Sequence, residues 1–126
     1  MLDHVRVMVA DLADARRFYE RVLAPLGYRV CHESTPGLVG LGPADRRAEP
    51  RATMWLRASE DASAGTLVSF TVADRATVDR FHAAGLEAGG ADGGTPALRP
   101  FHADYYSAYV IDPAGVTLEA VCHRAP

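Results

Sequence analysis

The chain repeats its own pattern at a fixed spacing of 63 residues, and this repeat limits the fold more than any other feature. The stretch DHVRVMVADLADARRF, which begins at Asp3, aligns without a gap on TLVSFTVADRATVDRF, which begins at Thr66. Identical residues include Val5 and Val68, Val9 and Val72, Asp11 and Asp74, Arg17 and Arg80, and Phe18 and Phe81. We therefore expect two copies of one supersecondary unit.

Each copy begins with a strand pattern that leads into a helix pattern. In residues 4–10 three valines occupy alternate positions, which is the period of a half-buried strand. In residues 11–27 apolar side chains recur at steps of three and four after an aspartate suited to begin a helix. Residues 66–73 and 74–90 repeat this strand and helix.

Further strands are expected after each helix. Extended segments bounded by turn-forming residues occur at residues 28–33, 37–42, 52–58, 105–112 and 116–123. The stretch GGADGGTPALRPFHAD is rich in glycine and proline, and one weak strand is expected within it near residues 96–101. The sequence DPAG before the last strand predicts a tight turn.

The predicted fold is α+β, with two tandem βαβββ modules that form a curved mixed sheet around a cleft. A chain of 126 residues is expected to be a single domain, with module one at about residues 1–60 and module two at about residues 65–126. Because each helix covers the valine-bearing face of its sheet, the opposite faces are left to line the cleft. These faces carry His4, Arg6 and Met8 in the first copy and Leu67, Ser69 and Thr71 in the second.

Charge and composition exclude several classes of partner. The chain has 13 basic and 16 acidic residues and no run of basic residues, so nucleic acid is not an expected partner. No membrane partner and a cytoplasmic location are expected, because no apolar run approaches the ~18 residues of a membrane span and no signal peptide is apparent. Cys31 and Cys122 lack metal or redox spacing and are expected to be reduced. The use of arginine and alanine with no lysine is typical of a bacterial protein.

Two motifs resemble one known family. HVRVMVADLADARRFYERVLAPLGY near the start and YYSAYVIDPAGVTLEAVCH near the end are similar to the vicinal oxygen chelate superfamily, the glyoxalase, bleomycin resistance and extradiol dioxygenase group. In metal-using members, the resemblance implies a divalent ion held by three residues, one each on the first strand, the matching strand of the second module and the last strand. These positions hold His4, Leu67 and Glu119. A fourth family ligand falls on Leu56 or Arg57, and neither binds a cation. The metal site is therefore predicted to be incomplete.

The candidate site residues follow from the open strand faces and from this resemblance. His4 and Glu119 are the candidate catalytic residues and the two remaining metal ligands. The candidate ligand-binding residues are Arg6, Met8, Trp55, Leu67, Ser69, His102 and Tyr109. A carboxylate in an apolar strand needs a partner, and a metal ion, His4 and Arg6 are expected partners of Glu119. His102 is a candidate substitute metal ligand or a donor at the cleft rim.

Two classes of function remain open at this point. The first is a small-molecule binding protein without chemistry, which the apolar residues Leu67, Leu56 and Met8 favour. The second is an enzyme, either a divalent-metal-dependent lyase, isomerase or dioxygenase, or a metal-free enzyme in which Glu119 is a general base. A small molecule is the expected ligand in both. A homodimer is also expected, because relatives commonly dimerise and open sheet edges favour a partner.

Overall fold

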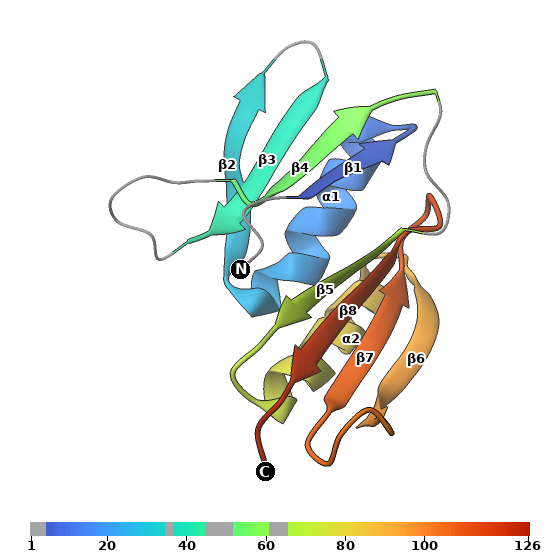
Figure 1. The fold of residues 1–126 in the computed structure, drawn as a ribbon. Helices are drawn as coiled ribbons and strands as arrows, with labels where there is room; N and C mark the ends of the chain where they lie inside the picture. Colours follow the sequence, from blue (N-terminus) through green and yellow to red (C-terminus); the bar gives the residue numbers. More distant parts are fainter. Residues whose placement is uncertain (1–4, 35–36, 45–51, 61–65) are drawn as a thin grey trace.

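The computed structural model of the protein describes residues 5–34, 37–44, 52–60 and 66–126, and its fold is drawn in Figure 1. The elements in chain order are β1 (Val5–Val9), α1 (Leu12–Leu23), the short 3-10 helix η1 (Ala24–Leu26), β2 (Tyr28–Ser34), β3 (Leu38–Pro43), β4 (Met54–Ala58), β5 (Leu67–Thr71), α2 (Arg75–Glu87), β6 (Ala91–Leu98), β7 (Tyr106–Ile111) and β8 (Thr117–Cys122). This order confirms the two βαβββ modules and the α+β class that the repeat predicts.

The strands form two four-stranded sheets with the same internal order. The first sheet runs β1-β4-β3-β2 and the second runs β5-β8-β7-β6. The pairs β1 with β4 and β5 with β8 are parallel, and the other pairs are antiparallel. Figure 1 shows one helix packed behind each sheet, so both sheets keep one face clear of helices. The two sheets are the structural counterpart of the sequence repeat.

Both long helices begin at aspartates that the repeat relates. The Asp11 side chain accepts a hydrogen bond from the backbone N–H of Asp14 at 2.9 Å, and the Asp74 side chain accepts one from Thr77 at 2.7 Å. Each aspartate satisfies a backbone donor that a helix start leaves unpaired. The predicted equivalence of the two helix starts is confirmed. Over the part of the chain described, no helix is long and apolar enough to cross a membrane.

One hydrophobic core joins the two modules. It contains side chains from both helices and from the valine-bearing faces of both sheets: Val7, Val9, Phe18, Tyr19, Val22, Leu23, Val39, Leu41, Met54, Leu56, Val68, Phe81, Val110, Val116, Leu118 and Ala120. Burial of this apolar surface is the main driving force for the packing of one module on the other. Alternate strand positions point away from the core and form the open face of each sheet.

A buried hydrogen bond also connects the modules. The Tyr19 hydroxyl on α1 donates to Asp112 Oδ2 at 2.8 Å, and both side chains are buried. Asp112 Oδ1 accepts from the backbone N–H groups of Ala114 at 2.9 Å and Val116 at 2.8 Å. The predicted turn between β7 and β8 is therefore confirmed, with Gly115 at a φ of 90° that favours glycine. Asp112 of this turn also forms the hydrogen bond to Tyr19 of the first module.

Strand β6 differs from the expectation. It spans Ala91–Leu98 as a full edge strand, whereas only a weak strand near residues 96–101 was expected. Glycine fits here because β6 lies beside the large side chain of Tyr109: a Cβ on Gly93 would lie 3.1 Å from Tyr109 Cβ, and one on Gly94 would lie 2.9 Å from Tyr109 Cδ2. Pro96 is tolerated because an edge strand has one side without ladder hydrogen bonds.

Candidate functional site

The open face of the second sheet carries a buried carboxylate among hydroxyl groups. Glu119 on β8 is only 3% exposed, although it points away from the helix-facing residues Leu118 and Ala120. Its Oε2 accepts a hydrogen bond from Ser69 Oγ on β5 at 2.6 Å, and its Oε1 accepts one from the Tyr105 hydroxyl at 2.9 Å. Neutral hydroxyl groups therefore compensate the buried charge.

These hydroxyl groups keep Glu119 negatively charged at neutral pH. Burial raises the pKa of the Glu119 carboxyl, but hydrogen bonds from Ser69, Tyr105, Tyr109 and Ser107 together outweigh burial and hold the pKa below its usual range. Burial and the hydrogen bond to Glu119 raise the pKa of Tyr105 to about 12, so its hydroxyl remains a donor. The cluster is therefore an anionic acceptor surrounded by protonated hydroxyl groups.

A row of cross-strand neighbours extends this cluster over the sheet. Ser69 on β5 is paired with Glu119 on β8, Glu119 with Tyr109 on β7, and Tyr109 with Gly94 on β6. Since directly paired residues share a face, these positions lie side by side on the open surface. The guanidinium of Arg99 lies over the Tyr109 ring, with Cζ at 5.1 Å from the ring centroid. The open face thus holds both a carboxylate and a guanidinium.

Besides Glu119, the sequence predicts two residues at metal-ligand positions, His4 and Leu67. His4 lies outside the described residues. Leu67 is 54% exposed on the same face of β5 as Ser69, so a hydrocarbon occupies the position where the family pattern has a metal ligand. The placement of Leu67 on the open face agrees with the strand alternation.

Three other predicted ligand-binding residues lie on the first sheet rather than beside Glu119. Arg6 and Met8 are on β1, where Arg6 is paired with Trp55 of β4. Arg6 was one of three expected partners of Glu119, and the described hydrogen bonds of Glu119 come instead from Ser69 and Tyr105. Trp55 packs edge-on against His32, with ring centroids 5.3 Å apart.

The pairing also corrects the first-module counterpart of Glu119. Arg6 and Ser69 are equivalent in the repeat, and they pair with Trp55 and Glu119 respectively. The counterpart is thus Trp55, whereas the constant spacing predicted Leu56 or Arg57. The reason is that hydrogen bonding to the first strand of the module, rather than distance along the chain, sets the register of the last strand.

His102, a candidate substitute ligand, has protein partners at both ring nitrogens. Its Nε2 lies 2.8 Å from His123 Nδ1, and its Nδ1 accepts from the backbone N–H of Asp104 at 3.2 Å. Both imidazoles pack against the Tyr105 ring, with centroid distances of 5.4 Å and 5.1 Å. The histidine pair therefore supports Tyr105, which in turn donates to Glu119.

The side chains around Glu119 do not fit a divalent metal site as far as the structure describes them. Both carboxylate oxygens accept from hydroxyl groups, and Leu67 supplies no lone pair. Within residues 5–34, 37–44, 52–60 and 66–126, no group of three His, Cys, Asp or Glu side chains is arranged to hold a metal ion.

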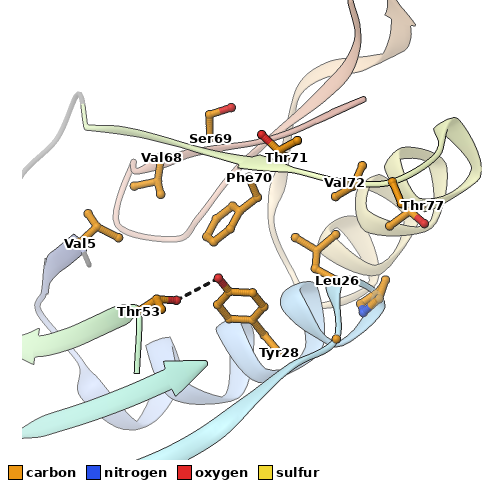
Figure 2. Close-up of a pocket in the computed structure, with 13 residues that line it drawn as sticks. Val5, Leu26, Tyr28, Thr53, Val68, Ser69, Phe70, Thr71, Val72 and Thr77 are labelled. Atoms are coloured by element: carbon orange, nitrogen blue, oxygen red, sulfur yellow. Dashed lines mark hydrogen bonds between the residues drawn. The ribbon is translucent and has the colours of Figure 1, made fainter. Parts of the chain in front are cut away.

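A separate pocket lies along the seam between the two modules, with a volume of about 580 Å³. Figure 2 shows Val68 and Phe70 of β5 facing Val5 and Tyr28 of the first module across it. Its polar groups include the Tyr28 hydroxyl and Thr53 Oγ1, which are hydrogen-bonded to each other at 2.9 Å. This seam pocket has a mixed polar and apolar lining that includes Ser69 but not Glu119.

Sequence reasoning missed Tyr105, Ser107 and Arg99 as parts of the Glu119 cluster. Tyr105 shares one face with the predicted site residue Tyr109 by strand alternation, and this is the signal that could have found it. Nothing in the sequence indicated that Arg99 belongs to this cluster, because its position depends on the unexpected strand β6. The serine partners of Glu119 follow only from the strand register.

The fold is that of a glyoxalase-like two-module protein. The chain matches the model of the Glyoxalase/Bleomycin resistance protein/Dioxygenase superfamily over residues 1–120, and it belongs to that superfamily.

Solved structures of the superfamily resemble the chain over nearly its whole length. A glyoxalase/bleomycin resistance protein from Albidiferax ferrireducens T118 is 26% identical with a TM-score of 0.79, and the match covers 95% of this chain and 97% of that chain. A glyoxalase/bleomycin resistance protein/dioxygenase family enzyme from Burkholderia phytofirmans PsJN is 19% identical with a TM-score of 0.75, and the match covers 98% of both chains. The comparison with curated proteins gave no match.

Proposed function

We propose that the chain is a small-molecule binding protein that holds its ligand on the open face of the second sheet, over Glu119. The observation that carries this proposal is the buried, anionic carboxylate of Glu119, which accepts hydrogen bonds from Ser69 and Tyr105. A buried charge with its own set of oriented donors is costly to maintain, and such groups are concentrated at functional sites.

The direction of the hydrogen bonds determines which ligand groups suit the site. Ser69 and Tyr105 donate their protons toward Glu119, so the lone pairs of their oxygens remain for a ligand. A surface of hydroxyl lone pairs above a negative carboxylate attracts cations and hydrogen-bond donors. We therefore propose that the ligand presents a positively charged or donor group to this cluster.

The pKa of Glu119 favours binding over proton transfer. A general base is most effective when its pKa lies near the working pH, whereas the pKa of Glu119 is held below its usual range. Such a carboxylate is a weak base, but it retains its charge for binding.

A divalent-metal-dependent lyase, isomerase or dioxygenase is the second candidate. The observation in its favour is the same ionised carboxylate, since metal ligands must be deprotonated. It requires donors beyond those that the described residues place around Glu119, so we rank it second.

We expect binding of the primary amine hexylamine to depend on Glu119. Replacing Glu119 with glutamine removes the negative charge but keeps the size, and should weaken the affinity by about tenfold, because the ligand cation loses the attraction of a nearby opposite charge. Calorimetric titration checks this, with Glu87→Gln on the exposed end of α2 as the matched control. Equal affinity in the parent and the Glu119→Gln protein would contradict the proposal.

The same titration has an expected pH dependence. Because the folded pKa of Glu119 is lowered, its charge should persist as the pH falls from 7 to about 5, and hexylamine affinity should stay constant over that range. The affinity for hexylamine should fall only when the pH drops below the usual range of carboxyl pKa values, where Glu119 becomes protonated.

We also propose that the protein is a homodimer. Each sheet ends in edge strands, and three large apolar side chains near the second sheet, Leu67, Leu98 and Phe101, are more than half exposed. A second copy that covers such edges and side chains removes apolar surface from water. Sedimentation at micromolar concentration should return the dimer mass, and a monomer alone would contradict this proposal.

A further inference from the structure

The open face of the second sheet has a fixed positive group as well as Glu119. Arg99 Nη2 donates to the carbonyl oxygens of Thr95 at 2.7 Å and Ser107 at 3.1 Å, and Nε donates to Ser107 Oγ at 3.4 Å. The guanidinium also stacks on the Tyr109 ring. These contacts immobilise a side chain that would otherwise have many rotamers.

The contacts of Arg99 leave one end of the guanidinium available. Nη2 and Nε are used, and no hydrogen bond from Nη1 occurs among the described residues. Two N–H groups in a fixed orientation on a half-buried cation match a carboxylate or another planar anion.

Glycine at position 94 makes room for this arrangement. A Cβ at Gly94 would lie 2.9 Å from Tyr109 Cδ2 and 3.2 Å from Arg99 Nη2. Any larger residue would therefore push the ring or the guanidinium away from its place. The glycine leaves space for the stack of Arg99 on Tyr109 in the middle of the open face.

The positive and negative groups stand at opposite sides of Tyr109. Glu119 is on β8 and Arg99 extends from the end of β6, with β7 between these strands. Two strand spacings place the backbones of β6 and β8 about 10 Å apart. The charged groups lie closer together than these backbones, since Arg99 Nε and Glu119 both hydrogen-bond to Ser107, and a small molecule over the Tyr109 ring can reach both.

Asp92, an acidic residue on the same strand as Gly94, is already engaged. Asp92 Oδ1 accepts from the backbone N–H of Gly94 at 2.8 Å and lies 3.0 Å from His82 Nε2. Its hydrogen bonds are therefore directed to its own strand and to α2. Arg99 makes its hydrogen bonds to Ser107 and to the Thr95 carbonyl instead.

We infer that the ligand of this face is a zwitterion, with its cationic group over the Ser69, Glu119 and Tyr105 cluster and its anionic group on Arg99 Nη1. This inference rests on the proposed binding function and adds the chemical class of the ligand. The two ends of one ligand would be recognised by opposite charges, and the Tyr109 ring would contact the hydrocarbon between them.

Three probes of matched length test the inference: aminohexanoate, hexylamine and hexanoate. The first carries both charges, the second only the positive charge and the third only the negative charge. Aminohexanoate should bind about tenfold or more tightly than either single-charge probe, because only it gains both charge-assisted contacts. Binding is measured by nuclear magnetic resonance titration of the full chain.

Variants of Arg99 separate its charge from its structural contacts. Arg99→Gln should reduce the affinity for aminohexanoate by more than it reduces the affinity for hexylamine, so that the preference for the probe with both charges is lost. Arg99→Lys keeps the positive charge and should restore part of the preference. Arg80→Gln, on the exposed side of α2, is the matched control and should change nothing.

The results of these titrations separate a failure of the zwitterion inference from a failure of the proposed binding function. If hexylamine binds over Tyr109 and Glu119 but aminohexanoate binds no more tightly, the zwitterion inference is wrong and the proposed binding function stands. If none of the three probes shifts the resonances of this face, both are wrong. If Arg99→Gln weakens hexylamine and aminohexanoate equally, Arg99 acts only through the fold and the inference is again overturned.

Discussion

Replacing Asp112 with alanine is expected to lower the free energy of unfolding by about 3 kcal/mol, because it leaves two buried donors and one half-buried donor without an acceptor. These donors are the Tyr19 hydroxyl and the backbone N–H groups of Ala114 and Val116. Since Asp112 is in the second module and Tyr19 in the first, the loss acts on the junction of the modules as well as on the turn. Urea unfolding followed by circular dichroism measures it.

Two further variants make this result specific. Tyr19→Phe removes only the hydrogen bond between the modules and should cost about 1 kcal/mol. Glu87→Ala, at an exposed position of α2, should have little effect. If Asp112→Ala is no more destabilising than Tyr19→Phe, the turn contacts of Asp112 contribute nothing; if Tyr19→Phe has no effect, the hydrogen bond between the modules does not stabilise the fold.

Replacing Leu67 with histidine is expected to strengthen nickel or cobalt binding on the order of 100-fold, because it adds a donor where the family pattern has one. Leu67 is exposed on the face of β5 that also holds Ser69, and Ser69 is the cross-strand partner of Glu119. Residues on one face of adjacent strands at this diagonal spacing are within reach of long side chains. The imidazole would join Glu119 and, by resemblance, His4.

The parent protein should bind these ions weakly and be purified with less than one ion per chain. Leu86→His is the matched control, because Leu86 is also an exposed leucine but lies on α2. Calorimetric titration should show near-stoichiometric binding for Leu67→His alone. Equal and tight binding by the parent would mean that other residues already complete a metal site.

The repeat predicted those parts of the fold that depend on local pattern. The alternating valines and the aspartates before each helix act over a few residues, and the structure places Asp11 and Asp74 at equivalent helix starts. Strand β6 was misplaced because glycine and proline usually favour turns. Here the glycines are required by the packing of Tyr109, which lies 15 residues beyond Gly94 in the sequence.

The candidate site was predictable only in part, since its contacts depend on strand register. Glu119 was identified because a charge in an apolar strand needs a partner, but its hydroxyl partners come from β5 and from the residue before β7. The same limit explains Trp55, whose position opposite Arg6 follows from pairing and not from a constant spacing. Arg99 was missed because its place depends on the stack with Tyr109.

The location of a bound amine tests the proposed site most directly. Hexylamine is titrated into the parent protein, and the backbone amide resonances are followed by nuclear magnetic resonance. Binding over the carboxylate cluster predicts the largest shifts at Ser107, Tyr109 and Glu119, and their loss in Glu119→Gln. Shifts gathered instead at Leu26, Tyr28 and Phe70, which line the seam pocket, would contradict the assignment of the ligand site to the open face of the second sheet.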